Sequence, residues 1–271
     1  MSTTTTTHTP TASGRSGATT TASRLGALAR AELTLLGRSR ATLVTALFVP
    51  FVLTLSLRSA TDDMQLADHG LSVGAVLLPA AVGVSLLFAI YASLTSVYVV
   101  RREELVLKRL RTGELRDTEI LVGAALPSVM IGLAQSVLLA IGYTALFDMD
   151  APRAPVLAVV GVLLGVVLCA AFGAVTAVVT RTSESAQVTS LPFLFVGLLG
   201  SGMAVPLELL PERAASLLEL LPLSPVMTLI RGAWTGDLSG YEVLGAVATA
   251  LAWTVLSVFA VRRWFPWEPR R

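Results

Sequence analysis

Residues 156–179 read VLAVVGVLLGVVLCAAFGAVTAVV, without one charged side chain, and this stretch decides the fold. A helix crosses the hydrocarbon core of a bilayer with about 20 mostly apolar residues, because about 30 Å must be covered at about 1.5 Å per residue. The run is apolar on every side, which is typical of a helix in lipid rather than of one that packs a single face on a soluble core. It predicts a transmembrane helix.

Five more runs of this kind lie on either side of it. The predicted spans are 41–57, 71–100, 120–147, 156–179, 188–205 and 243–261. They predict an all-α polytopic membrane protein with six transmembrane helices. The sequence is 54% hydrophobic over 271 residues, which leaves no room for a soluble domain of ordinary size. Residues 1–22, rich in Thr and Ser, predict a disordered tail, and 23–271 predict one transmembrane domain.

The basic residues give this pattern an orientation. If the N-terminus is inside, the inner segments hold 16 of the 20 Lys and Arg residues, and the outer segments hold only Arg58, Arg153, Arg213 and Arg231. Positively charged loops are retained on the cytoplasmic side, so both termini are predicted to be cytoplasmic. Lys108 is the only lysine, and this preference for arginine is typical of high-GC bacteria. We therefore expect a multi-pass protein of the bacterial plasma membrane.

Composition also disfavours several classes of function. The motif G-x-x-x-x-G-K-[ST] does not occur, so any ATP-driven work needs a partner subunit. The pI of about 9.0 follows from the basic inner rim and contact with lipid headgroups, so no nucleic-acid partner is expected. Asp62, Asp63, Asp68 and His69 could hold a metal, but their spacing matches no strong site, and a solvated acidic loop is the better interpretation. A membrane enzyme is thus the weaker hypothesis, and neither a metal nor a catalytic residue is predicted.

An amphipathic helix is predicted before the first span. Residues 24–38 place leucines in one sector of a helical wheel and basic residues in the other, as in helices that lie in the membrane interface. The predicted interfacial residues are Arg24, Arg30, Glu32 and Arg38. Glu32 falls in the apolar sector, where pairing with a nearby arginine is the simplest explanation.

The loop after the second span is the most informative stretch, and it reads as one short charged helix. Arg101, Glu104, Lys108 and Arg111 recur at spacings of three and four, Glu104 and Lys108 are a favourable pair, and Thr112-Gly113 ends the helix. Asp117 then caps the third span. Taken alone, these charges favour a solvated loop that obeys the positive-inside rule.

Two further features concern packing. Gly161, Gly165, Cys169 and Gly173 recur every four residues and give the fourth span a small face that lets another helix approach closely. The sequence leaves open whether that helix belongs to the same chain. After the fifth span, Pro211 and Pro222 bracket one short helix, predicted to lie at the outer surface before the last span.

Two stretches resemble a known family. The charged "LKRLRTGEL" (107–115) and "EILVGAALP" (119–127) are similar to the cytoplasmic loop and third span of type-2 ATP-binding-cassette (ABC) exporter permeases. "FLFVGLLGSGMAVPLELLPERAASLLELLPLSPVMTLIRGAWTG" (193–236) resembles the fifth span, outer helix and return of the same family, especially its drug- and antibiotic-export branch. The ending "RRWFPWEPRR" (262–271) looks like the actinobacterial members. Only the Thr-rich tail departs from the resemblance.

The resemblance implies partners and roles. In that family the loop after the second span and the N-terminal amphipathic helix contact a separate ABC ATPase subunit, which binds ATP and Mg²⁺, and two permeases pair as a homodimer or related heterodimer. It therefore implies that the loop is a coupling surface for the ATPase. The residues concerned are Arg101, Arg102, Glu104, Lys108, Arg109, Arg111 and Glu114. No cofactor is expected on this chain itself.

The apolar spans favour an energy source outside the bilayer. No Asp, Glu, Lys, Arg or His lies between the span ends, whereas ion-coupled carriers usually need such groups. A path of this composition suits a hydrophobic or amphiphilic small molecule, and its candidate lining residues are Phe193, Phe195 and Met203. Export of a glycan or lipid-linked polymer is the alternative within transport, which neighbouring genes would discriminate. A nontransporting membrane sensor subunit is the third.

Overall fold

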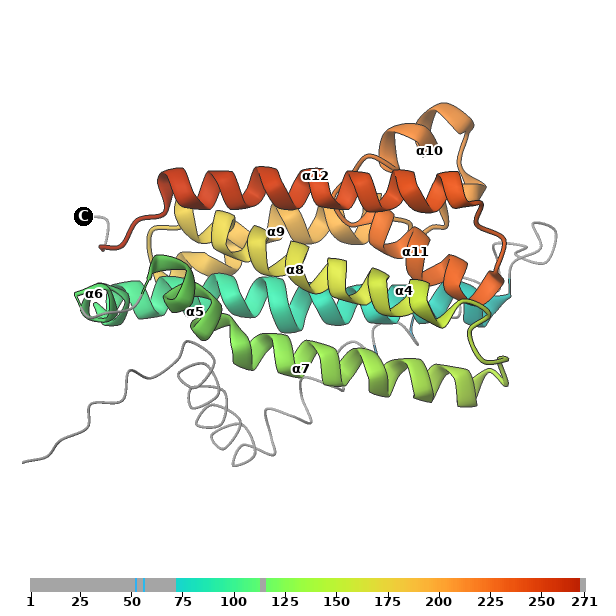
Figure 1. Cartoon of the computed structure of the whole chain (residues 1–271), viewed down its shortest axis with the longest axis horizontal. Coiled ribbons are helices and arrows are strands. Elements are labelled where there is room, and N and C mark those ends of the chain that lie inside the picture. Colours follow the sequence, from blue (N-terminus) through green and yellow to red (C-terminus); the bar gives the residue numbers. More distant parts are fainter. Residues whose placement is uncertain (1–51, 53–55, 57–71, 113–115, 269–271) are drawn as a thin grey trace, which may run out of the picture.

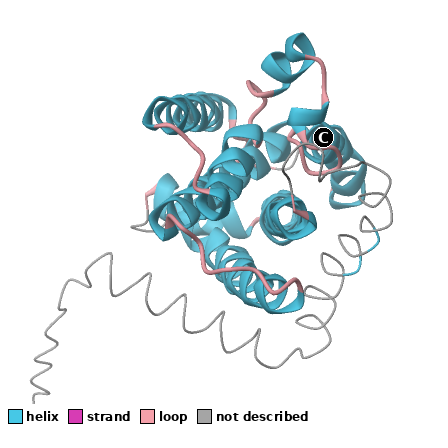
Figure 2. Ribbon diagram, turned by 90° about the vertical axis from the view of Figure 1, so that its right-hand side faces the viewer, coloured by secondary structure: helices cyan, strands magenta, loops and turns pink. Residues whose placement is uncertain are grey.

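Long apolar helices run side by side through most of the chain (Figure 1). The computed structural model describes Val52, Ser56 and residues 72–112 and 116–268. Its elements, in order, are α4 (Val73–Ser85), the π-helix η2 (Leu86–Ala92), α5 (Ser93–Glu103), α6 (Val106–Arg111), α7 (Asp117–Leu146), α8 (Pro155–Val179), α9 (Ser183–Gly200), the 3₁₀ turn η3 (Leu207–Leu209), α10 (Glu212–Leu218), α11 (Ser224–Thr235) and α12 (Gly240–Trp264). Within these ranges every regular element is a helix, and Figure 2 shows no strand. The described part of the chain is all-α, as predicted.

Four helices are long and apolar enough to cross a membrane. They are Val73–Glu103, Asp117–Leu146, Pro155–Val179 and Gly240–Trp264, and they match the second, third, fourth and last predicted spans. The first predicted span and the interfacial helix fall almost entirely outside the described residues. The fifth corresponds to α9, which is shifted toward the N-terminus of its predicted range and is not one of the four. Six spans therefore stay a prediction.

The start of α9 has a local cause. The hydroxyl of Thr182 accepts a hydrogen bond from the Ser185 backbone N–H at 3.2 Å, and Ser185 Oγ accepts one from the Thr182 N–H at 3.1 Å. This reciprocal pair satisfies backbone donors that have no partner inside the helix. The helix begins at Ser183 because this cap lies ahead of the apolar run, and 201–205 then form bends instead of a further helical turn.

The connections alternate between two ends of the bundle. In Figure 1, α6 and the end of α12 lie at one end, and α10 lies at the other with the start of α12. We call these the α6 end and the α10 end. The described basic residues in the segments at the α6 end are Arg101, Arg102, Lys108, Arg109, Arg111, Arg116, Arg181, Arg262 and Arg263. Those of the α10 end are Arg153, Arg213 and Arg231. The charge asymmetry that the sequence predicts for the two membrane faces is thus also an asymmetry between the two ends of the molecule.

The second span forms the centre of the bundle. In its most apolar stretch 83% of the residues are buried, whereas in that of α12 only 17% are, although both stretches are apolar enough to face lipid. Its middle is the π-helix η2, and a Cβ on Gly132 of α7 would lie only 2.6 Å from Ile90 Cδ1 of this segment. Polar bonds add to this packing: Ser85 Oγ donates to Gln135 Oε1 at 2.7 Å, and Ser93 and Ser128 share a bond of 2.9 Å. Such bonds hold membrane helices together where no hydrophobic force acts between them.

A short helix of the α10 end was not predicted. α10 lies between Pro211 and Pro222, where one helix is predicted, but α11 follows it and packs against α8, α4 and α12. Ser224-Pro225 starts α11, since proline is favoured in the first turn of a helix. Arg231, predicted to lie in an outer segment, is buried in α11, where Nη2 donates to the Gly202 carbonyl at 3.2 Å.

Candidate functional site

The charged loop after the second span forms a bend. α5 ends at Glu103, Glu104 and Leu105 make the turn, and α6 follows; we call residues 104–111 the elbow. Leu105 has a φ of 59°, a left-handed conformation that costs a residue with a side chain about 1–2 kcal/mol. The predicted continuous helix is therefore wrong. Because the helix breaks between them, Arg101 and Glu104 do not stack on Lys108 and Arg111.

One face of the elbow is anchored to the rest of the molecule. Leu107 is fully buried, and Lys108 Nζ lies 2.8 Å from Glu268 Oε1 near the C-terminus. The guanidinium carbon of Arg111 lies 4.8 Å from the ring centroid of Trp267, a cation–π contact. Lys108 therefore pairs with Glu268 and not with the predicted Glu104. Sequence reasoning missed this contact, since 160 residues of chain, 108–268, separate the partners.

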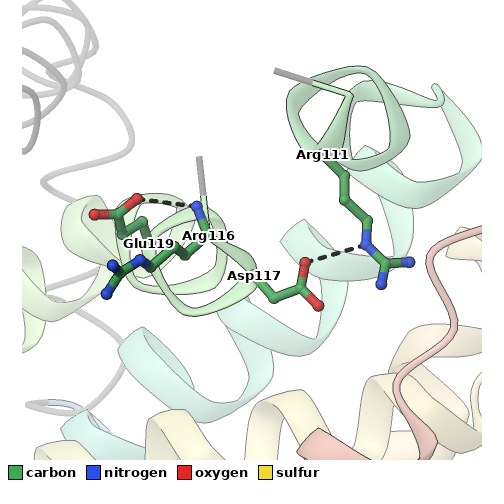
Figure 3. Close-up of polar contacts among 4 residues, drawn as sticks. All are labelled: Arg111, Arg116, Asp117 and Glu119. Carbon is green, nitrogen blue, oxygen red and sulfur yellow. Dashed lines mark hydrogen bonds and ion pairs between the residues drawn. The ribbon is translucent and has the colours of Figure 1, made fainter. Parts of the chain in front are cut away.

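The start of α7 also contacts the elbow. Arg111 Nε donates to Asp117 Oδ1 at 3.1 Å, as drawn in Figure 3. Glu119 Oε2 accepts a hydrogen bond from the Arg116 backbone N–H at 2.9 Å, so Arg116 occupies the N-cap position. Asp117, predicted to cap this helix, is instead its first residue and pairs with the elbow.

Arg102 differs most from its predicted place. It was predicted on the exposed coupling surface, but it is fully buried and its guanidinium reaches the end of α8. A buried guanidinium cannot touch a partner protein directly. The reason is that α5 still runs beside α8 at this level, so position 102 faces inward and not into solvent.

The exposed part of the predicted coupling surface is smaller as a result. Glu104, Lys108, Arg109 and Arg111 are exposed, and Arg101 is half-buried. Leu105 adds an apolar side chain, 38% exposed, at the tip of the bend. Glu114 lies outside the described residues, as do Arg24, Arg30, Glu32 and Arg38 of the predicted interfacial helix and Asp62, Asp63, Asp68 and His69 of the acidic loop. The elbow thus presents a mainly basic surface with one leucine among its charges.

Local electrostatics favour the anchored form of the elbow. The hydrogen bond from Lys108, together with its positive charge, lowers the pKa of Glu268 below the ordinary value. The carboxylate is therefore ionised, and the ion pair with Lys108 is formed, at neutral pH. Because both side chains are largely exposed, salt screens this attraction.

The small face of α8 lies against helices of the same chain. Gly161 faces α11, where a Cβ would lie 3.0 Å from Ile230 Cγ1, and Gly173 faces the second span, where a Cβ would lie 3.0 Å from the Tyr91 carbonyl oxygen. Gly165 lies between these two neighbours, and Cys169 is fully buried.

The three candidate pathway residues do not share a surface. Phe193 is half-buried in an aromatic cluster, 4.3 Å from the ring of Phe172 and 4.5 Å from that of Tyr91. Met203 is 2% exposed and packs on Gly83 of α4. Phe195, at 56% exposure, points away from the chain. Of the three, only Phe195 is available to a passenger or to another subunit without rearrangement.

Comparison with protein-family models gives a match over most of the chain. The model of a protein family described as "ABC-2 type transporter" matches residues 23–234. No curated protein matches the chain. The matched range contains the elbow, α8, α9 and all of α11 but its last residue, and it leaves out α12 and the C-terminal contact with the elbow.

Proposed function

The chain belongs to the ABC-2 type transporter family, and on that premise we propose that it is the permease subunit of an ATP-driven exporter of hydrophobic or amphiphilic small molecules. Two permease copies would form the path, and separate ABC ATPase subunits would bind ATP and Mg²⁺. The α6 end would face the cytoplasm of a bacterial cell. The drug- and antibiotic-export branch is the part of the family that the sequence resembles.

One observation supports this proposal above the others. At the end of the bundle where the described basic residues gather, α6 exposes Lys108, Arg109 and Arg111 outside the long apolar helices. Charged side chains on a protruding short helix guide association with an oppositely charged partner and set its orientation. The exposed Leu105 beside them would add the apolar contact that binding surfaces usually contain. These are features of a docking surface for a soluble subunit.

The composition of the spans supports an external energy source. In the four described candidate spans, every Asp, Glu, Lys and Arg lies within a few residues of an end, as Glu119 and Arg262 do. A proton or sodium relay needs ionisable groups deep in the membrane. Movement driven by the ATPase through the elbow, shifting the population of inward- and outward-open states, needs none.

The proposed passenger follows from the side chains that face outward. Phe195, Leu199 and Val188 of α9 are all more than half exposed, and polar groups are scarce between them. A polar solute would find few hydrogen-bond partners on such a surface. A lipophilic molecule that moves there from the membrane would stay in an apolar environment and would lose little favourable free energy.

Docking is tested with one charge reversal and a matched control. Arg109→Glu places a negative charge at the exposed centre of α6, so co-purification of the ATPase should fall at least about tenfold, as expected when a charge at an interface is reversed. Arg213→Glu makes the same change on exposed α10 at the other end and should leave co-purification unchanged. Equal recovery of the ATPase with both variants would refute docking at the elbow.

The passenger class is tested with the reconstituted complex. A panel of lipophilic compounds is added to proteoliposomes, and at least some members should stimulate ATP hydrolysis. Sugar nucleotides and free oligosaccharides serve as the polar comparison. Stimulation by the polar set alone would overturn the passenger proposal while leaving the ATPase partnership intact.

A further inference from the structure

Two neighbouring residues at the base of the elbow contact the turn between α8 and α9, residues 180–182, and the helix ends on either side of it. The first is Arg102, whose Nη1 donates to the Ala177 carbonyl at 2.9 Å. Its Nη2 donates to the carbonyls of Thr180 at 2.7 Å and Arg181 at 3.2 Å. The carbonyls of Ala177 and Thr180 belong to the last turn and the C-cap of α8, where backbone acceptors lack partners inside the helix, and that of Arg181 follows directly. Arg102 thus caps α8 from a different helix.

The second residue, Glu103, contacts the other side of the same turn. Its Oε1 accepts a hydrogen bond at 3.1 Å from the backbone N–H of Ser183, the first residue of α9. The two charges match the helix ends that they meet, since a C-terminus is partly negative and an N-terminus partly positive. A cation and an anion adjacent in sequence therefore hold the end of one helix and the start of the next.

This connection is rigid. Arg102 is fully buried, and a planar guanidinium that donates to three carbonyls can neither rotate nor slide without losing several bonds at once. Breaking it would leave a buried charge without compensation, which is among the costliest changes in a protein. A displacement of the last turn of α5 must therefore carry the α8–α9 turn with it.

A second connection lies deeper in the bundle. The hydroxyl of Tyr91 in η2 lies 3.1 Å from Thr176 Oγ1 of α8 and donates to the Ser190 carbonyl of α9 at 3.2 Å. The second span is therefore bonded to α9 at two levels, at Ser183 and at Ser190. These two bonds link α9 to the second span over this half of the bundle.

We propose that Arg102 and Glu103 are positioning residues that transmit displacement of the elbow to α8 and α9. The inference rests on the proposed function, because it needs an ATPase that moves the elbow. It gives Arg102 a role different from that of the exposed docking residues: Arg102 does not bind the partner but passes its motion on. α9, with its exposed Phe195 and Leu199, is the helix that receives the motion.

The test follows two fluorescent labels in the complex of permease and ATPase. A polarity-sensitive dye is attached either to Thr112→Cys, exposed at the end of α6, or to Val188→Cys, exposed on α9. The natural Cys169 is buried, so the chain without an added cysteine serves as the blank. MgATP with vanadate, the only ligand added, is used to trap the ATPase.

In the parent complex both labels should respond. With Arg102→Met, which removes the donors and keeps an apolar stem, the response at position 112 should remain and the response at 188 should be reduced, since the bonds of Glu103 and Tyr91 to α9 stay in place. Arg102→Lys, which keeps the charge and some donors, should restore part of the response. The label at 188 should respond more strongly in Glu103→Gln, which keeps an oxygen acceptor, than in Glu103→Ala.

Arg181→Ala is the matched control. It removes an exposed positive side chain from the same turn but keeps the backbone carbonyl that Arg102 uses, so both labels should respond as in the parent. If Arg102→Met does not fold, the comparison of Glu103→Ala with Glu103→Gln decides, since this pair changes only the half-buried bond to Ser183.

The outcomes separate this inference from the proposed function. A response at 188 that is undiminished in both Arg102→Met and Glu103→Ala would overturn transmission through these residues while leaving docking in place. Parallel loss at 112 and 188 would show that the two residues only maintain the fold, which also overturns it. No response at 112 in a parent complex that hydrolyses ATP would refute the coupling role of the elbow itself, and the inference with it.

Discussion

Glu268 is the side chain through which the end of the chain holds α6. Its contact with Lys108 is the one direct ion pair found between the described C-terminal residues and the elbow, and Trp267 beside it contacts Arg111. Both side chains of the pair are more than half exposed, so the contact biases the position of α6 without fixing it. An elbow that moves with the proposed ATPase would need an anchor of this modest strength.

Glu268→Gln should loosen α6 without unfolding the bundle. Amide hydrogen exchange in 106–111, measured by mass spectrometry at neutral pH, should accelerate by up to about fivefold, the range expected for an exposed pair. Glu219→Gln, at the exposed C-cap of α10, removes the same charge at the other end and should leave α6 unchanged. Equal exchange in Glu268→Gln and the parent would contradict the anchoring role.

The same pair predicts a dependence on pH. Lys108 lowers the pKa of Glu268 below the ordinary value of 4.5, so the folded contact binds a proton less readily than the free carboxyl does. Its stabilisation is therefore complete above that value and is lost as the pH falls through the lowered pKa. After correction for intrinsic exchange, the parent should approach Glu268→Gln only in that acidic range; convergence near neutral pH would be inconsistent with this assignment.

Gly173 decides how closely α8 approaches the second span. A Cβ there would lie 3.0 Å from the Tyr91 carbonyl oxygen and 3.2 Å from Leu94 Cβ, and the backbone atom cannot turn aside. Gly173→Ala should therefore lower the free energy of unfolding by about 1–3 kcal/mol. Gly142→Ala on α7, where a Cβ meets nothing within 4 Å, should be neutral or stabilise by up to about 1 kcal/mol.

Thermal unfolding in detergent measures this difference, with the buried Cys169 as reporter. A thiol-reactive dye labels this only cysteine when the bundle opens. A midpoint for Gly173→Ala equal to that for Gly142→Ala would show that the two helices can separate without cost.

At the scale of the element, apolar length predicted the long helices well. The fourth predicted span, 156–179, begins one residue after α8 and ends with it. The third and last spans, 120–147 and 243–261, differ from α7 and α12 by at most three residues at either end. Hydrophobicity determines such helices because lipid contacts them along most of their length. Their ends add polar caps, such as Ser239 with Glu242, that hydropathy alone does not detect.

Short helices were predicted poorly, because tertiary contacts determine them. Nothing in Glu104-Leu105 marks a break, since neither residue is Gly or Pro; the bend accompanies the burial of Leu107 and the contact of α6 with the distant Glu268. α11 was missed because its 12 residues are too few for a span. The burial of Arg102 depends on the carbonyls of a helix 75 residues away and has no sequence signal.

The short helices α6 and α10 provide a test of orientation. We predict that Leu217→Cys on α10, 71% exposed, reacts with a membrane-impermeant thiol reagent in intact cells. Arg109→Cys on α6 should react only after the cells are permeabilised, because basic segments stay inside. The parent, with Cys169 buried, gives the background. If only Arg109→Cys were labelled in intact cells, the topology would be the inverse of the proposed one.

The whole molecule combines a polar, basic end with a bundle that has no ionisable group deep inside its four described candidate spans. Two designs of transporter differ on this point. A carrier driven by an ion gradient binds the ion near the middle of the membrane, whereas a permease driven by a motor subunit needs only a surface to be pushed and helices that move together. Here the elbow would be the surface, and the second span with α8 and α9 the helices.

Transport in proteoliposomes distinguishes the two designs. With the ATPase and MgATP present, accumulation of a lipophilic dye that stimulates ATP hydrolysis should persist when a protonophore and a sodium ionophore collapse all gradients. The permease alone, given a proton or sodium gradient, should transport nothing above empty liposomes, because none of the four described candidate spans carries an ionisable group deep in the membrane. Arg213→Glu serves as the active control for altered surface charge. Arg109→Glu, even with the ATPase and MgATP present, should transport no more than the permease without the ATPase. Gradient-driven transport without the ATPase would contradict the motor-driven design even if the elbow still bound the ATPase.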